Sequence, residues 1–366
     1  MRWRKALKDM KAYTPGRSIK EVKALYGLEE VVKLASNENP YGTAPAVTRH
    51  LNSENINFEI YPDGYAGELR EKMANKLGVA ENTLIFGSGS DELIVLIARA
   101  LLGTGTNTIV ATPTFPQYAH HAKIEGATVK EIPLIDGSHD LDSFVQAIDE
   151  DTSVIWLCSP NNPTGNLIKQ ADLIGFLEKV PENILVVIDE AYYEYIVDED
   201  YVNTIKLIEQ FSNVIVLRTF SKIYGLAAFR VGYGISHPTI IANLDTVRSP
   251  FNVTTAGLQL AEKSLDDDKF IDECRTVNRE QMVRFKHFAE NNNLHFFDSE
   301  ANFLLIEVPG SATVVTEKFL QHGFIVRSGD ALGIPGYVRV TIGTEAQNTA
   351  FFKAFDAVLE GVGQVN

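Results

Sequence analysis

Short apolar strands alternate with helix-like segments through the middle of the chain, and this alternation limits the fold more than any other feature. Several of the expected strands, such as 153–160 and 213–220, are apolar without the polar–apolar alternation of a half-exposed strand. Strands of this kind are covered on both faces, and helices between them indicate a mostly parallel α/β sheet. The expected strands are residues 107–112, 128–134, 153–160, 183–190, 213–220 and 230–235, and helical spacing is clearest at 91–102 and 170–180.

The pattern changes near residue 250. A long helical stretch leads to shorter expected strands at 301–308, 323–328 and 336–343, which predicts a smaller α+β domain. We therefore expect a three-part organisation. Its parts are an N-terminal arm at 1–40 that packs on the smaller domain or on a second subunit, a large α/β domain at 41–250, and a small C-terminal domain at 251–366.

Charge and cysteine content exclude several classes of protein. The formal net charge of −15 would repel nucleic acids and anionic membranes, although a few local arginines can still hold a small anion. Two cysteines are too few for a disulfide framework or a structural zinc site. The first residues, MRWRKALKDMKAYTPG, lack the apolar core of a secretory signal, and no apolar run approaches ~20 residues. We expect a reduced, cytoplasmic protein.

Polar residues follow the expected strands where ligands collect, at the carboxyl ends of a parallel sheet. The turn GSGSDE (87–92) opens a helix, and free N–H groups there attract anions, although such turns are also common as plain connections. Asp189 ends an apolar strand, where a carboxylate needs a cationic or donor partner unless it simply caps a helix. Lys222 follows the 213–220 strand, and Arg230 comes eight residues later.

This set of groups suits pyridoxal 5′-phosphate. The cofactor requires a lysine for a Schiff base at its aldehyde and a carboxylate beside its pyridinium nitrogen. Its phosphate requires an anion cradle, and its ring an aromatic side chain for stacking. The sequence has no HExxH motif, Cys/His metal pattern or Ser/His/Asp hydrolase elbow, so we expect no metal.

The chain resembles the fold-type I pyridoxal-phosphate aminotransferases, and more closely the histidinol-phosphate aminotransferase family. The resemblance implies the fold of that class, a large domain with a seven-stranded, mostly parallel sheet and a small α+β domain. It spans nearly the whole chain. The segments that carry it are LASNENPYG (34–42), YPDG (61–64), GSGSDE, TPTFPQY (112–118), SPNNPTG (159–165), DEAYYEY (189–195), RTFSKIYGLAAFRVGY (218–233) and YVRVTIGT (337–344).

The resemblance implies roles for the residues of the cofactor site. Lys222 bonds the cofactor and moves the substrate proton, Asp189 pairs with the pyridinium nitrogen, and Tyr192 holds the phenolic oxygen of the ring. Tyr61 reaches the cofactor phosphate of a neighbouring subunit, which implies a homodimer. The other implied contacts are Asn162 at the phenolic oxygen, Phe115 on the ring face, and Ser90, Asp91, Thr219, Ser221 and Arg230 around the phosphate.

The resemblance also implies a substrate site. Arg339 binds the substrate's anionic group with help from Asn162, and Arg327 and Tyr13 add contacts to a substrate phosphate, unless these two residues only pack or lie on the surface. The implied substrates are L-histidinol phosphate and 2-oxoglutarate, in histidine biosynthesis. A guanidinium binds phosphate and carboxylate alike, so an aromatic or phenylalanine aminotransferase, or one of dual specificity, is the alternative. A carbon–sulfur lyase, a cofactor-sensing regulator and a dehydrogenase fit the sequence less well.

Overall fold

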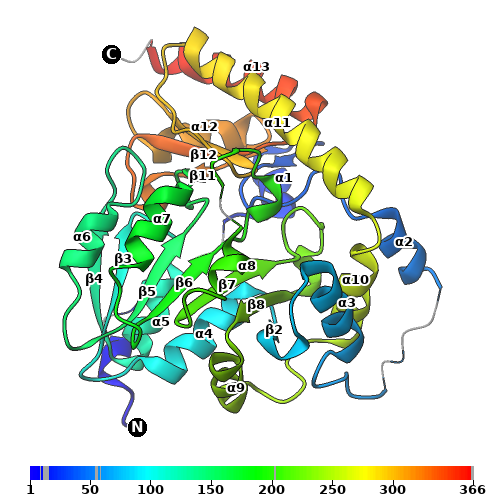
Figure 1. The fold of residues 1–366 in the computed structure, drawn as a ribbon. Coiled ribbons are helices and arrows are strands. Elements are labelled where there is room, and N and C mark those ends of the chain that lie inside the picture. The colour runs from blue at the N-terminus through cyan, green and yellow to red at the C-terminus, as the bar shows by residue number, and fades with distance from the viewer. Residues whose placement is uncertain (9, 11–15, 54–56, 58, 202, 364–366) are drawn as a thin grey trace.

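A seven-stranded sheet lies at the centre of the computed structural model, which describes residues 1–8, 10, 16–53, 57, 59–201 and 203–363 (Figure 1). β8 runs antiparallel to its neighbours β2 and β7, and the other pairs are parallel. This sheet confirms the predicted fold class. In spatial order the strands are β2 (Leu84–Gly87), β8 (Gly232–Ser236), β7 (Val214–Thr219), β6 (Leu185–Asp189), β5 (Thr152–Cys158), β3 (Asn107–Thr112) and β4 (Thr128–Pro133).

Successive residues of the central strands enter two separate hydrophobic cores, one on each face of the sheet. Leu157 and Ile188 belong to one core, and their neighbours Trp156 and Val187 belong to the other. The strands therefore carry apolar residues at every position, as a doubly covered sheet requires. The first core is covered by α2 (Pro45–Leu51), α3 (Gly67–Leu77), α6 (Leu141–Gln146), α7 (Gln170–Leu177), α8 (Thr204–Leu207) and α10 (Thr255–Ser264), and the second by α4 (Ser90–Leu101), α5 (Gln117–Glu125) and α9 (Pro238–Val247).

A second unit with its own core is built from the C-terminal elements and part of the N-terminal segment, and we call it the C-terminal unit. Its antiparallel sheet has the order β11-β12-β9, and its core is rich in phenylalanine. The N-terminal strand β1 adds to it by pairing in parallel with β10. Its elements are α1 (Ile19–Tyr26), β1 (Val32–Lys33), α11 (Asp268–Asn291), β9 (Phe303–Glu307), α12 (Ala312–Gln321), β10 (Phe324–Ile325), β11 (Arg327–Ser328), β12 (Tyr337–Thr341) and α13 (Glu345–Gly363).

The strand expected at 323–328 is two strands in different sheets. β10 pairs with β1, whereas β11 pairs with β12, and the chain passes from one sheet to the other at Val326. The apolar run is continuous, so only the two pairing partners reveal the division. The described part of the chain also has five short 3₁₀ helices, Lys5–Lys8, Glu81–Thr83, Tyr193–Tyr195, Ala227–Phe229 and Asp330–Leu332.

α11 contributes to the cores of both units. Ile271 and Cys274 near its start join the core beneath the large sheet, and Phe285 and Ala289 near its end join the C-terminal core. α10 packs on α2 and α3 of the large unit.

The domain limits at residues 40 and 250 stay predictions. Within the described residues, no helix is both long and apolar enough to cross a membrane.

Candidate active site

The candidate site lies where the central parallel strands end. Asp189 is the last residue of β6, and its neighbours in register are Cys158 on β5 and Leu217 on β7. Lys222 follows β7 by three residues, and β2 ends at Gly87, just before the turn into α4. The topology therefore brings these segments, which are far apart in sequence, to one edge of the sheet.

Asp189 is buried, with 3% of its surface exposed. Its Oδ2 accepts a hydrogen bond from the Tyr118 hydroxyl at 2.6 Å, and its Oδ1 accepts one from the Ala191 N–H at 3.1 Å. Among the described residues, no nitrogen of a Lys, Arg or His side chain lies within the 4.0 Å that defines an ion pair with this carboxylate. Burial raises the pKa of the Asp189 carboxyl to about 6 despite these hydrogen bonds.

Tyr118 is a site residue that the sequence analysis missed. It lies in the first turn of α5, is fully buried, and stacks on Trp156 with ring centroids 5.0 Å apart. Phe115, three residues earlier, packs edge-on against Tyr118 at 5.6 Å and is only partly buried, so part of its ring remains accessible. The sequence feature that could have indicated Tyr118 is its position in TPTFPQY, one helical turn after the aromatic residue Phe115.

The start of α4 is the place where the sequence predicts an anion cradle. Gly89 has φ +81°, a conformation that residues with a side chain rarely adopt, and a Cβ there would lie 2.6 Å from Nη2 of Arg230 and displace it. A Cβ on Gly232 would collide with the backbone nitrogen of Ser90. Both glycines therefore allow the first turn of α4, where Ser90 and Asp91 lie, to approach Arg230 closely.

Arg230, Ser221 and Thr219 meet beside this helix start. Nη1 of Arg230 donates to Oγ of Ser221 at 3.2 Å, and the Ser221 N–H donates to Oγ1 of Thr219 at 3.1 Å. Nη2 of Arg230 is also 3.7 Å from a carboxylate oxygen of Asp91. The two hydroxyl residues are buried, while half-exposed Arg230 is open to a ligand. The structure thus brings together all five residues predicted around the phosphate, with Ser90 and Asp91 supplied by α4.

Lys222 is partly buried, and its Nζ donates a hydrogen bond to the Ser36 carbonyl oxygen at 3.3 Å. Burial lowers the pKa of Lys222 to about 8. The charge of Arg339 is the next cause, and Arg230 makes a smaller contribution. The proximity of Arg339, which lies 117 residues after Lys222 in the chain, was not predicted.

Tyr192 lies beside Lys222, with the lysine Nζ 5.5 Å from the centre of the tyrosine ring. Its hydroxyl oxygen accepts a hydrogen bond from Nδ2 of Asn37 at 2.9 Å. Burial raises the pKa of Tyr192 to about 12, so the side chain is a neutral phenol near pH 7. Asn37 was also missed, because nothing local in LASNENP indicates which distant side chain it contacts.

The predicted substrate residues gather around β12. Nη1 of Arg339 donates to Oδ1 of Asn162, and its Nη2 donates to the Ala35 carbonyl oxygen at 2.8 Å. Arg327 on β11 is the cross-strand partner of Arg339, so both side chains leave the same face of the sheet. Tyr13 lies outside the described residues.

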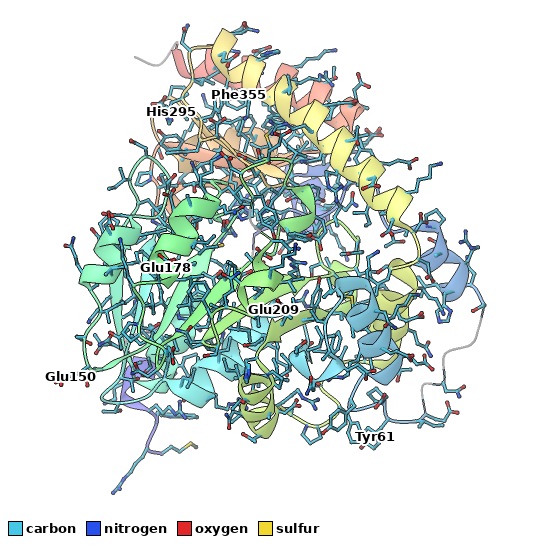
Figure 2. All side chains as sticks on the ribbon, viewed as in Figure 1. Tyr61, Glu150, Glu178, Glu209, His295 and Phe355 are labelled. Carbon is cyan, nitrogen blue, oxygen red and sulfur yellow. The ribbon has the colours of Figure 1, made fainter. Side chains whose placement is uncertain are left out.

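Tyr61 is a predicted site residue whose side chain lies on the surface of the described chain. It is 78% exposed and stacks on Phe251 with ring centroids 4.9 Å apart. Figure 2 shows it at the outer edge, on the side away from His295 and Phe355 of the C-terminal unit. Ile60 and Tyr65 beside it are also exposed.

A buried ion pair next to the site was not predicted either. Nε of Arg218 on β7 lies 2.9 Å from Oε2 of Glu190, and both side chains are 1% exposed. The hydroxyls of Thr204 and Tyr201 donate to the other carboxylate oxygen of Glu190 at 2.9 and 3.2 Å. A charged residue within the apolar run VIVLRT was the available signal.

Comparisons with known proteins agree with this geometry. A model of the family described as aminotransferase class I and II matches residues 29–355. The chain is 50% identical to a histidinol-phosphate aminotransferase of Lysinibacillus sphaericus over 363 residues, which cover 99% of each chain. It is 50% identical to the protein of that name from Bacillus subtilis strain 168 over 349 residues, 95% of this chain and 97% of the relative.

Solved structures share the fold at lower identity. The histidinol-phosphate aminotransferase of Sinorhizobium meliloti in complex with pyridoxal-5′-phosphate has a TM-score of 0.89 and 24% identity, covering 99% of this chain and 98% of that one. A double mutant of the aspartate aminotransferase of Thermus thermophilus has a TM-score of 0.82 and 21% identity, covering 98% and 100%. At these identities the likeness establishes the fold.

Proposed function

The chain belongs to the class I and II aminotransferase family, and we propose that it is a pyridoxal 5′-phosphate-dependent histidinol-phosphate aminotransferase. In this reaction L-histidinol phosphate and 2-oxoglutarate give imidazole acetol phosphate and L-glutamate, a step of histidine biosynthesis. The observation that carries the proposal is that Lys222 and Asp189 lie at one edge of the large sheet, and that Arg339, the cross-strand partner of Arg327 in the C-terminal unit, is close enough to lower the pKa of Lys222. The two relatives that are half identical over nearly the full chain support the same substrate.

The residues present fit the proposed cofactor. The buried Asp189 carboxyl has no ion-pair partner among the described residues, and a pyridinium N–H would supply one. The glycine-lined start of α4, with Arg230, Ser221 and Thr219, presents the N–H, guanidinium and hydroxyl donors that a phosphate needs. Phe115 offers a partly exposed ring for stacking, and Tyr192 offers a neutral hydroxyl to the phenolic oxygen.

When bound, pyridoxal 5′-phosphate supplies an electron-withdrawing ring that stabilises negative charge on the substrate α-carbon. Lys222 would hold the group through its Nζ, and its free amine would take the proton from the substrate α-carbon. With its pKa at about 8, about one-tenth of the Lys222 side chains are neutral at pH 7, compared with fewer than ~0.1% for an unperturbed lysine. The desolvated site thus makes Lys222 a usable base.

The arginines of β11 and β12 recognise the substrate anion. Cross-strand partners have Cβ atoms about 4.5–5.5 Å apart, so the Arg327 and Arg339 guanidinium groups can reach one anion together. Two positive charges at this spacing favour a phosphate dianion over a single carboxylate. Asn162, already hydrogen-bonded to Arg339, links this anion site to the cofactor site.

We further propose that the enzyme is a cytoplasmic homodimer in which Tyr61 contributes to the neighbouring active site. Tyr61, Ile60, Tyr65 and Phe251 are all exposed, and four large apolar side chains of this kind are typical of a surface that another chain covers. The two cysteines, Cys158 and Cys274, are both free, as in a reducing compartment. A Tyr61→Phe variant mixed with a Lys222→Ala variant would test the shared site by complementation.

The function is tested with the purified chain and added pyridoxal 5′-phosphate. We expect a visible absorption band that an amino donor bleaches, and a kcat/KM for histidinol phosphate at least about tenfold above that for phenylalanine, because the second arginine is used only by the phosphate. A higher kcat/KM for phenylalanine would show an aromatic aminotransferase instead. The absence of any cofactor band would overturn the proposal.

A further inference from the structure

Three consecutive residues near the N-terminus contact three different side chains of the candidate active site. The carbonyl oxygen of Ala35 accepts a hydrogen bond from Arg339 at 2.8 Å, and that of Ser36 accepts one from Lys222 at 3.3 Å. Nδ2 of Asn37 then donates to the Tyr192 hydroxyl oxygen at 2.9 Å. Of these three contacts, only that of Asn37 is made by its side chain, so its removal can be tested by substitution.

Asn37 is held rigidly for this contact. It is 1% exposed and has φ +57°, a left-handed conformation that asparagine tolerates better than most residues. Its N–H donates to Oγ1 of Thr341 at 2.9 Å, and its carbonyl oxygen accepts a hydrogen bond from Nδ2 of Asn302 at 3.0 Å. The backbone of Asn37 is thus fixed to the C-terminal unit on both sides.

Thr341 also determines which way the Asn37 amide points. Its hydroxyl oxygen already accepts the Asn37 N–H, and its own hydrogen is donated to Oδ1 of Asn37 at 3.0 Å. An amide whose oxygen is engaged in this way presents its NH₂ group to the opposite side, where Tyr192 lies. The donor at Tyr192 is therefore determined by the hydrogen-bond network.

The Asn37 contact decides what the Tyr192 hydroxyl can do. Because Nδ2 of Asn37 donates to the phenol oxygen, the hydroxyl hydrogen of Tyr192 is left to point elsewhere. The tyrosine ring lies beside Lys222, so that hydrogen is available on the side of the site where the cofactor ring would lie. An acceptor in place of Nδ2 would instead turn the hydrogen back toward residue 37.

We propose that Asn37 is a positioning residue that directs the hydroxyl hydrogen of Tyr192 into the active site and couples it to β12. Thr341 and Arg339 are two residues apart on β12 and therefore face the same side. A displacement of β12 when Arg339 binds an anion is passed through Thr341 to Asn37 and then to Tyr192. This inference rests on the proposed function, in which Tyr192 donates to the phenolic oxygen of pyridoxal 5′-phosphate.

Two substitutions of Asn37 test the proposal in the holoenzyme, with Tyr192→Phe as the reference. Asn37→Asp keeps the shape but replaces the donor by an acceptor, and Asn37→Gly removes the amide while keeping a residue that accepts the left-handed backbone. The readout is the pH titration of the cofactor absorption band. We expect its apparent pKa to rise by about one unit in Tyr192→Phe and Asn37→Asp, and by less in Asn37→Gly, because a donor to the ring oxygen is lost.

Controls separate a positioning role from a merely structural one. Thr341→Val removes the hydroxyl that orients the amide and also accepts the Asn37 N–H, and we expect a smaller shift of the band in the same direction. The double variant Asn37→Gly/Tyr192→Phe should shift the band no further than Tyr192→Phe alone. In the Asn37 variants kcat should fall about tenfold, while KM for the amino donor changes by less than about twofold.

Three results would overturn the inference. The first is a band pKa in the Asn37→Gly holoenzyme within about 0.2 unit of the wild type. The second is a shift in the double variant that equals the sum of the two single shifts. The third is a wild-type protein without a cofactor band, which would overturn the proposed function as well. A normal wild-type band with unshifted variants refutes only the role of Asn37. If Asn37→Asp does not fold, the Asn37→Gly variant alone provides the test.

Discussion

The two halves of the candidate site are built in different ways. In the cofactor half, Asp189, Thr219 and the residues that follow them are placed by neighbouring strands of one buried sheet. In the substrate half, Arg339 contacts Ala35, 304 residues earlier in the chain, and Asn162 of the large unit. The first half depends mainly on strand register, whereas the second depends on how two units and the N-terminal segment pack together.

This difference has an energetic consequence. A site placed by a doubly covered sheet shares the stability of the global fold, whereas contacts between packed units can open at a lower free-energy cost. Substitutions in the cofactor half should therefore abolish chemistry without changing specificity. Substitutions in the substrate half should change which substrates are used and leave the chemistry intact.

The largest expected effect is that of Lys222→Ala in the cofactor half. Both the bond to the cofactor and the base at the substrate α-carbon are lost, so kcat should fall by at least about 10⁴-fold. Lys222→Arg is the control for charge, and it should be equally inactive, because a guanidinium has no neutral form near pH 7. Steady-state kinetics would contradict the assignment if Lys222→Ala stayed within tenfold of the wild type.

Asp189→Asn should reduce kcat by roughly 10³-fold, because the charge opposite the pyridinium nitrogen disappears. The matched control is Glu190→Gln, the same change in the adjacent buried acid, whose partner is Arg218. That variant should lose about 3–5 kcal/mol of unfolding free energy, since it leaves a buried guanidinium unpaired, yet retain turnover per folded molecule. Equal losses of kcat in both variants would show that Asp189 acts only through the fold.

Asp189 should also make the cofactor-free protein less stable as the pH rises. Its pKa is about 6 in the folded chain against 3.8 for an unperturbed aspartate, so the folded state binds this proton more tightly than the unfolded state. This contribution to stability is present at low pH and is lost between about pH 4 and 6, by roughly 3 kcal/mol. Denaturant unfolding of the wild type and Asp189→Asn across this range measures it.

The comparison of the two proteins is needed because other buried groups titrate nearby. Burial raises the pKa of Glu194 to about 7, which adds to the loss of stability, and lowers the pKa of His139 to about 4, which opposes it. Both groups are common to wild type and Asp189→Asn, so their effects cancel in the difference. A difference in unfolding free energy that does not change with pH would contradict the assigned environment of Asp189.

The sequence was sufficient for the cofactor half because its signals are local. Lys222, Arg230 and the glycine turn each lie within a few residues of an apolar strand, and the carboxyl ends of parallel strands meet at one edge. Six of the seven strands and the double covering of the sheet follow from the same apolar runs, whereas β2 was not among the expected strands and the count of seven came from the resemblance. Only the end of the predicted helix 170–180, which stops at Leu177, and a few strand limits differ.

The missed features are contacts between segments that no local pattern connects. Tyr118 contacts Asp189 across 71 residues, and Asn37 contacts Tyr192 across 155. The division of 323–328 into β10 and β11 depends on β1, which comes from the N-terminal segment. In each case the residue types were visible, but the partner was determined by tertiary packing.

The smallest expected effect is that of Arg327→Gln, and it separates the two halves of the site best because Arg327 belongs to the substrate half alone. Arg327→Gln removes one charge-assisted hydrogen bond to the substrate phosphate, so kcat/KM for histidinol phosphate should fall about tenfold. The half-reaction with glutamate, which has no phosphate, should change by less than about twofold. Arg284→Gln on α11 is the matched control, because it removes an equal charge from a surface helix of the same unit. An equal loss of kcat/KM for both amino donors would mean that Arg327 stabilises the pairing of β11 with β12 and does not bind the phosphate. Arg339 would then be the only arginine of this pair that binds the substrate anion.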